Sequence, residues 1–106
     1  MTDLQDLMDV IGKKYVFNKE NYPSLDTSSP EKILIFSVVH SILHMNKAVG
    51  ALSAEIELND HGGLVSVIRM RQATTKMLIN TLKLASELGM NAEDLARLVP
   101  QVMKSK

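Results

Sequence analysis

The fold is decided by residues 30–58, PEKILIFSVVHSILHMNKAVGALSAEIEL, the most apolar segment of the chain. Its large apolar residues alternate spacings of three and four positions: Ile35, Val38, Ile42, Met45, Val49, Leu52 and Ile56. This spacing predicts a long helix that packs against another helix along its whole length. Ser29 is a good N-cap, and Pro30 and Glu31 suit the first turn, so we expect the helix to run from about Pro30 to Leu58.

A second long helix is predicted directly after the first. Residues 59–63, Asn-Asp-His-Gly-Gly, end the first helix, because glycine readily takes the left-handed backbone that helix ends need. The second helix is expected from about Leu64 to Leu88, where Gly89 stops it. Its main stripe is formed by Met70, Thr74, Met77, Thr81, Leu84 and Leu88. The short connection between the two helices predicts an antiparallel pair.

Shorter helices are expected at both ends of the chain. Residues 3–14 form an amphipathic pattern with Thr2 as N-cap, and residues 15–30 form a connector rich in turn signals. Asn91 is the expected N-cap of a final helix, in which Pro100 predicts a kink or an early end. The expected buried side of this helix consists of Leu95, Leu98, Val99 and Val102.

These elements predict an all-α helical bundle and a single domain over residues 1–106. Residues 1–30 would hold the N-terminal helix and connector, and residues 31–106 the core helices. Two long antiparallel helices bury little by themselves, and a chain of 106 residues builds only a modest core. We therefore expect a second subunit to complete a four-helix core, in a homodimer or a homotetramer.

Composition narrows the class of protein further. The chain has no cysteine, so disulfides and thiolate metal sites are excluded. The first residues lack the basic and apolar regions of a signal peptide. No apolar run is expected to reach membrane-spanning length, because polar residues interrupt the most apolar segment: Ser37, His40, Ser41, His44 and Asn46. We expect a soluble cytoplasmic protein that does not associate with membranes.

Charge is unevenly distributed along the chain although its formal net value is zero. No acid occurs between Asp60 and Glu87, whereas this stretch holds Arg69, Arg71, Lys76 and Lys83. Such a stretch can attract an anionic ligand, or it can hold two halves or two subunits together.

Two segments resemble the all-α nucleotide pyrophosphohydrolases of the MazG type. Residues 47–52, Lys-Ala-Val-Gly-Ala-Leu, are similar to the framework of that family's Glu-Glu-x-Gly-Glu-Leu motif. Residues 72–89 are similar to its second motif, which has a Glu and an Asp four positions apart and a leucine-alanine ending before a Gly. The resemblance covers about residues 40–103 and implies a MazG-like bundle.

The carboxylates of the family are missing from both segments. Their positions are occupied by Lys47, Ala48, Ala51, Ala73 and Lys76. The family's Mg²⁺ needs such oxygen ligands, so we expect neither a metal cofactor nor catalytic residues here. The alternative, an active Mg²⁺-dependent (d)NTP pyrophosphohydrolase with an atypical site, would have only Glu55 and Glu57 nearby.

The resemblance also implies a cavity between the helices. In the family, the second helix presents one side to the nucleotide. Here that cavity would be lined by His44, Lys47, Gln72, Lys76 and Asn80. Lysines in place of a metal can hold phosphate directly. We therefore expect a non-catalytic binding or assembly module that takes a nucleotide or another phosphate without turnover.

Two further patterns give alternatives. His40 and His44 share a helix face and would hold Zn²⁺ if a third ligand came from elsewhere, but a polar strip is the simpler interpretation. Residues 77–99 fit a helix-turn-helix pattern that would make the protein a DNA-binding regulator. Glu93 and Asp94 would begin the reading helix, where acids repel phosphates, so nucleic acid is not the expected partner.

Overall fold

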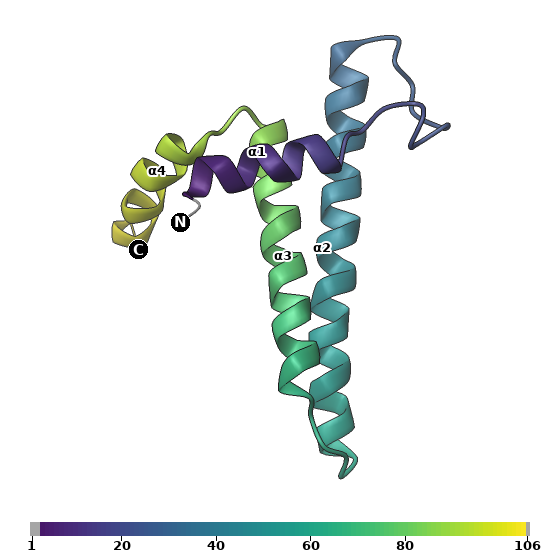
Figure 1. The fold of residues 1–106 in the computed structure, drawn as a ribbon, viewed down its shortest axis with the longest axis vertical. Coiled ribbons are helices and arrows are strands. Elements are labelled where there is room, and N and C mark those ends of the chain that lie inside the picture. Colours follow the sequence, from purple (N-terminus) through teal and green to yellow (C-terminus); the bar gives the residue numbers. More distant parts are fainter. Residues whose placement is uncertain (1–2, 106) are drawn as a thin grey trace.

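The structure is a computed structural model that describes residues 3–105 and is helical throughout its regular parts. Its four helices are α1 (Leu4–Lys14), α2 (Pro30–Asp60), α3 (Val67–Glu87) and α4 (Ala92–Lys104). Between residues 3 and 105 there is no strand. Figure 1 shows α2 and α3 side by side and antiparallel, with α1 and α4 grouped near the C-terminal end of α3. The prediction of an all-α fold with two long and two short helices is therefore confirmed.

Local sequence signals set most of the helix ends. The Ser29 hydroxyl accepts a hydrogen bond from the Lys32 backbone N–H at 3.2 Å and begins α2. Asn91 and Asp94 form a reciprocal capping box at the start of α4. Gly62 and Gly89, which follow α2 and α3, have φ angles of +83° and +78°. In each case the predicted residue supplies the cap or the left-handed backbone that the helix end needs.

Three boundaries differ from the prediction. Helix α3 begins at Val67, three residues later than expected, because Ser66 supplies the N-cap. Helix α4 continues through Pro100 to Lys104 and does not end early. The N-cap of α1 is Asp3, whose carboxylate accepts from the Asp6 backbone N–H at 2.8 Å, while Thr2 lies outside the described residues.

The main hydrophobic core lies where α1 meets the C-terminal half of α3 and the start of α4. Met8 and Ile11 of α1 pack against Leu82 and Ala85 of α3, and the half-buried Ile79, Met90, Ala92 and Leu95 surround them. The expected buried side of α4 is only partly buried. Leu95 and Leu98 are half-buried, whereas Val99 and Val102 are exposed, because no other element covers the far end of this helix.

The contact between α2 and α3 uses small and polar residues. On α2 the buried positions are Ser37, Ser41, Ala48 and Glu55, and Ala73 is buried on α3. The large apolar side chains predicted to pack along the neighbouring helix are turned to one side of this contact. Four of them remain widely exposed: Ile35 at 55%, Ile42 at 42%, Val49 at 43% and Ile56 at 59%. The stripe exists as predicted, but α3 covers only part of it: Val38, Met45 and Leu52 are half-buried, and Thr81 of α3 contacts Met45.

Helix α2 is long and apolar enough to be compared with membrane-spanning helices. By length and composition alone it qualifies as a candidate membrane span, and only 17% of its apolar window is buried within the chain. This differs from the expectation that polar interruptions would keep the segment below that threshold. One such helix is weak evidence for a membrane, since core helices of soluble proteins meet the same criteria.

Candidate functional site

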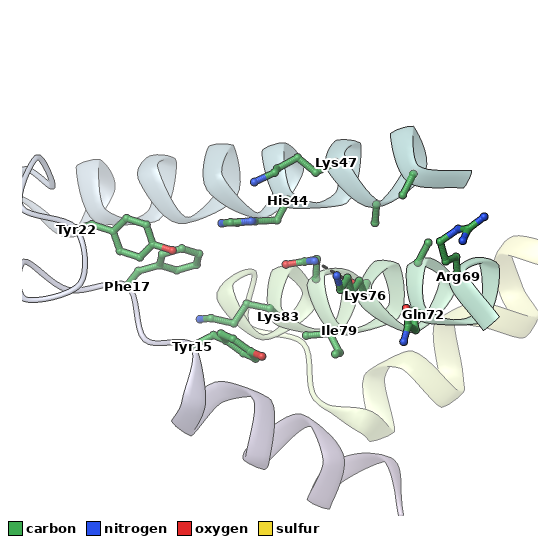
Figure 2. A pocket seen from close by; sticks show the side chains of 14 residues that line it. Tyr15, Phe17, Tyr22, His44, Lys47, Arg69, Gln72, Lys76, Ile79 and Lys83 are labelled. Atoms are coloured by element: carbon green, nitrogen blue, oxygen red, sulfur yellow. Dashed lines mark hydrogen bonds between the residues drawn. The ribbon is translucent and has the colours of Figure 1, made fainter. Parts of the chain in front are cut away.

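A pocket of about 760 Å³ lies along one side of the α2–α3 pair, and the connector that follows α1 borders one end of it. Figure 2 shows its layout: aromatic side chains of the connector at one end, Arg69 at the other, and basic and amide side chains of both long helices between them. We call this side of the pair the pocket face.

Four basic side chains and no carboxylate line the pocket. Lys47 comes from α2, and Arg69, Lys76 and Lys83 come from α3. Their spacing of seven residues places the three α3 groups on one side of that helix. Within the described part of the chain, Lys47 and Lys76 form no ion pair, whereas Arg69 and Lys83 each contact one carboxylate. Two lysines from facing helices are thus available to an anion.

An ion pair closes one end of the pocket. The buried Glu55 of α2 accepts hydrogen bonds from the Arg69 guanidinium, with Nη2 at 3.3 Å from Oε2, and from the Ser66 backbone N–H at 2.9 Å. These hydrogen bonds, that of Arg69 first, hold the pKa of Glu55 below its ordinary value. The same pair raises the pKa of Arg69. The arrangement therefore fixes the start of α3 against α2 with both groups charged.

Lys83 lies at the opposite end of the pocket. Its side chain is buried, forms an ion pair with Glu87 one turn later, and places Nζ 4.6 Å from the centre of the Phe17 ring. A cation over an aromatic face is attracted by the ring's negative charge distribution. Lys83 thus holds the connector against α3 and shapes the aromatic end of the pocket.

Aromatic side chains from the connector form that end. Tyr15, Phe17 and Tyr22 line the pocket, and the ring centres of Phe17 and Tyr22 are 5.3 Å apart. Phe36 and His40 of α2 support them from behind: the ring centres of Tyr22 and His40 are 5.2 Å apart, and His40 stacks on Phe36 at 3.7 Å. The pocket therefore combines a basic part with an aromatic wall.

All five residues that the sequence assigned to a ligand lie around this one pocket: His44, Lys47, Gln72, Lys76 and Asn80. The side chain of Asn80 donates to the Lys76 backbone carbonyl at 2.8 Å, which fixes its amide. The aromatic residues Tyr15, Phe17 and Tyr22 were not among the predicted site residues. A signal was available, since three of the four Phe and Tyr residues of the chain fall within residues 15–22.

The two histidines do not form a metal site with a third ligand. His40 Nδ1 donates to the Phe36 carbonyl at 3.0 Å, and its ring lines a separate hollow of about 330 Å³, whereas His44 lines the main pocket. Over residues 3–105, no group of three His, Cys, Asp or Glu side chains is placed to hold a metal ion. The zinc interpretation therefore lacks its third ligand within one described chain.

The helix-turn-helix pattern corresponds to the end of α3, the turn at Gly89 and the start of α4. Glu93 and Asp94 lie in the first turn of α4. The hydrogen bond from the Asn91 backbone N–H, followed by that from Arg97, lowers the pKa of Asp94, so this carboxylate stays ionised. A negatively charged helix start is poorly suited to the phosphates of a duplex.

Comparison of the chain with protein-family models, with curated proteins and with solved structures gave no match. The similarity to the MazG type thus stands on the residues quoted above and remains a prediction.

Proposed function

We propose that the protein binds a nucleotide, or a closely similar phosphate ester with a planar ring, in this pocket and does not hydrolyse it. The observation that carries the proposal is the presence in one cavity of an aromatic wall and two lysines, Lys47 and Lys76, that have no ion-pair partner among residues 3–105. In this proposal the protein is a MazG-like binding module whose carboxylates have been replaced.

The basic part of the pocket suits phosphate oxygens. Lys47 and Lys76 reach the cavity from different helices, so a phosphate group between them would be held from two sides. Ammonium groups act on phosphate as point charges with several donors. Gln72 and Asn80 add neutral side-chain donors along the same side of α3.

The aromatic wall suits a planar ring. Tyr15, Phe17 and Tyr22 offer ring faces and edges at one end of the cavity. Stacking of a base on an aromatic side chain contributes about 1–3 kcal/mol. A volume of about 760 Å³ falls within the range of small-molecule sites, about 300–1,000 Å³.

The lining argues against Mg²⁺-dependent hydrolysis. Mg²⁺ is held by oxygen ligands, usually carboxylates together with phosphates, and no Asp or Glu lines the pocket. Two acids contact lining residues and both are engaged: Glu55 by Arg69 and Ser66, and Glu87 by Lys83. The ligand would be held by cationic side chains directly, so its affinity should not require a metal.

Isothermal titration with ATP and other common (d)NTPs, in Mg²⁺ and in EDTA, tests the proposal. We expect binding in both conditions and no release of pyrophosphate. Lys47→Glu and Lys76→Glu together should weaken binding by about a hundredfold, since two attractive charges become repulsive. Arg71→Glu is the matched control, because Arg71 lies on the same helix but does not line the pocket.

Each outcome of these titrations either supports or contradicts the proposal. Weaker binding in the lysine variant with unchanged binding in the Arg71 variant supports the proposal. An absence of binding by the unmodified protein, an equal loss in both variants, or release of pyrophosphate would each contradict it.

A further inference from the structure

The side of the α2–α3 pair that faces away from the pocket is apolar, and none of the residues that define it is fully buried. We call it the bare face and define it by the α2 stripe Ile35, Val38, Ile42, Met45, Val49, Leu52 and Ile56 with the α3 stripe Met70, Thr74, Met77, Thr81 and Leu88. The two stripes adjoin, because the Thr81 hydroxyl lies 3.5 Å from the Met45 sulfur. No member of the bare face is charged.

The surface area of the chain exceeds what a compact monomer would expose. The accessible surface is 7919 Å², whereas a folded monomer of 11.8 kDa exposes about 5,900 Å². The radius of gyration is 16.5 Å, against about 13 Å for a compact domain of this length. The excess of about 2,000 Å² per chain matches what each subunit of a stable homodimer buries, about 1,000–2,500 Å².

We propose that a second copy of the chain covers the bare face and that two α2–α3 pairs form a four-helix core. The alternating spacing of three and four residues on both helices suits helix-on-helix packing of this kind. An uncharged surface carries no like-charge repulsion when it meets itself, as a two-fold interface requires. The proposal is independent of the pocket, which lies on the opposite side and would stay open in both subunits.

A lipid surface fits the observations less well. Lys47 lies near the middle of α2, and Glu55 forms an ion pair with Arg69 across the helix contact. A bilayer would have to accommodate these charges, at considerable cost. Lipid also requires no particular spacing of apolar residues, whereas the stripes of α2 and α3 keep a helix-packing register along their length.

Sedimentation equilibrium of the complete chain tests the proposal. We expect a mass twice the 11.8 kDa of one chain. Ile42→Glu together with Val49→Glu should weaken self-association by roughly a hundredfold or more, because the interface would bury unpaired charges. Leu43→Glu is the matched control: Leu43 is 51% exposed and adjacent to Ile42, but lies on a different side of α2.

A second measurement keeps the proposal testable if the double variant fails to fold. The chain has no cysteine, so Val49→Cys and Leu43→Cys each introduce a single thiol. We expect a short thiol-reactive cross-linker to give dimers of the Val49→Cys protein and not of the Leu43→Cys protein. A monomeric mass for the unmodified chain, equal cross-linking of both variants, or sedimentation with phosphatidylcholine vesicles in place of self-association would overturn the proposal.

Discussion

The two sides of the α2–α3 pair differ in chemistry although the same two helices build them. On the pocket face, basic and amide groups surround a cavity that the connector closes with aromatic rings. On the bare face, the stripe from Ile35 to Ile56 is uncharged, and four of its seven residues are exposed. One helix can thus carry the proposed ligand site on one side and the proposed association surface on another, since its period separates the two sets of side chains.

The small residues between the helices explain how both sides remain available. The buried residues Ser37, Ser41 and Ala48 of α2 and Ala73 of α3 are small, whereas no large apolar residue of the α2 stripe is fully buried. The large apolar residues are displaced to one flank and the long basic residues to the other. A contact built from leucines would have buried the stripe and removed the association surface.

The largest expected effect concerns the bare face and stability. The midpoint of thermal unfolding should rise with protein concentration, because self-association stabilises only the folded chain. Ile42→Glu with Val49→Glu should remove this dependence and lower the midpoint by about 10 °C or more. Differential scanning calorimetry over a wide concentration range measures both. A midpoint that is independent of concentration in the unmodified protein would contradict the proposal that the bare face is an association surface.

The next effect concerns the aromatic end of the pocket. Tyr22→Ala should weaken binding of a nucleotide by about tenfold, because one stacking surface is lost. Binding of inorganic triphosphate should change little, since the lysines that would hold phosphate are retained. Titration of both ligands into the same variant makes the comparison. An equal loss for the two ligands would show that Tyr22 supports the fold of the pocket and does not contact a ring.

A smaller effect concerns pH and the ion pair that closes the pocket. Hydrogen bonds from Arg69 and Ser66 lower the pKa of Glu55 from its ordinary value of 4.5. The folded state therefore binds this proton less readily than the unfolded state, so the stabilisation is present above pH 4.5 and is lost as the pH falls through the lowered pKa.

The variant Glu55→Gln tests this predicted direction of the change in stability with pH. The stability of the variant should fall less than that of the unmodified chain as the pH is lowered from 4.5, as measured by urea unfolding. Asp26 and Asp94 also have lowered pKa values and remain in both proteins, so their effects cancel in the difference. An unchanged pH dependence would mean that the pair with Arg69 does not persist in solution.

The smallest expected effect concerns the helix contact itself. The buried Ser41 hydroxyl has no hydrogen-bond partner among residues 3–105, whereas the Ser37 hydroxyl donates to the Ile33 carbonyl at 2.9 Å. Ser41→Ala should raise the free energy of unfolding by about 1 kcal/mol, because an unsatisfied polar group is removed. Ser37→Ala, which removes the hydrogen bond to the Ile33 carbonyl, should not stabilise the protein. Urea unfolding of the two variants measures these changes in the free energy of unfolding. If neither variant is more stable than the unmodified protein, the Ser41 hydroxyl has a hydrogen-bond partner in solution.

Local signals made much of the fold predictable. Ser29, Asn91 and Gly89 each act within a few residues, so their effect on helix ends can be read without knowing the tertiary structure. The same holds for pocket residues on regular helices: the periodicity of α3 brings Gln72, Lys76 and Asn80 to one side whatever else surrounds it.

What could not be predicted depends on the tertiary arrangement. The stripe on α2 indicates a packing surface but does not say which partner covers it, and the contact with α3 used smaller residues instead. The connector has no regular spacing of apolar residues, so the sequence did not reveal that Tyr15, Phe17 and Tyr22 fold back onto the pocket. Helix α3 begins later than predicted for a similar reason, because Glu55 of another helix accepts a hydrogen bond from the Ser66 backbone N–H.

In the two proposals together, one side of the α2–α3 pair binds a nucleotide while the other side binds a second copy of the chain. Sedimentation velocity of the unmodified protein with a fluorescently labelled ATP, followed through the label, tests both parts together. We expect the label to sediment with a species of twice 11.8 kDa. A label that remains with free nucleotide would contradict the pocket, and a label that sediments with a single chain would contradict the association surface.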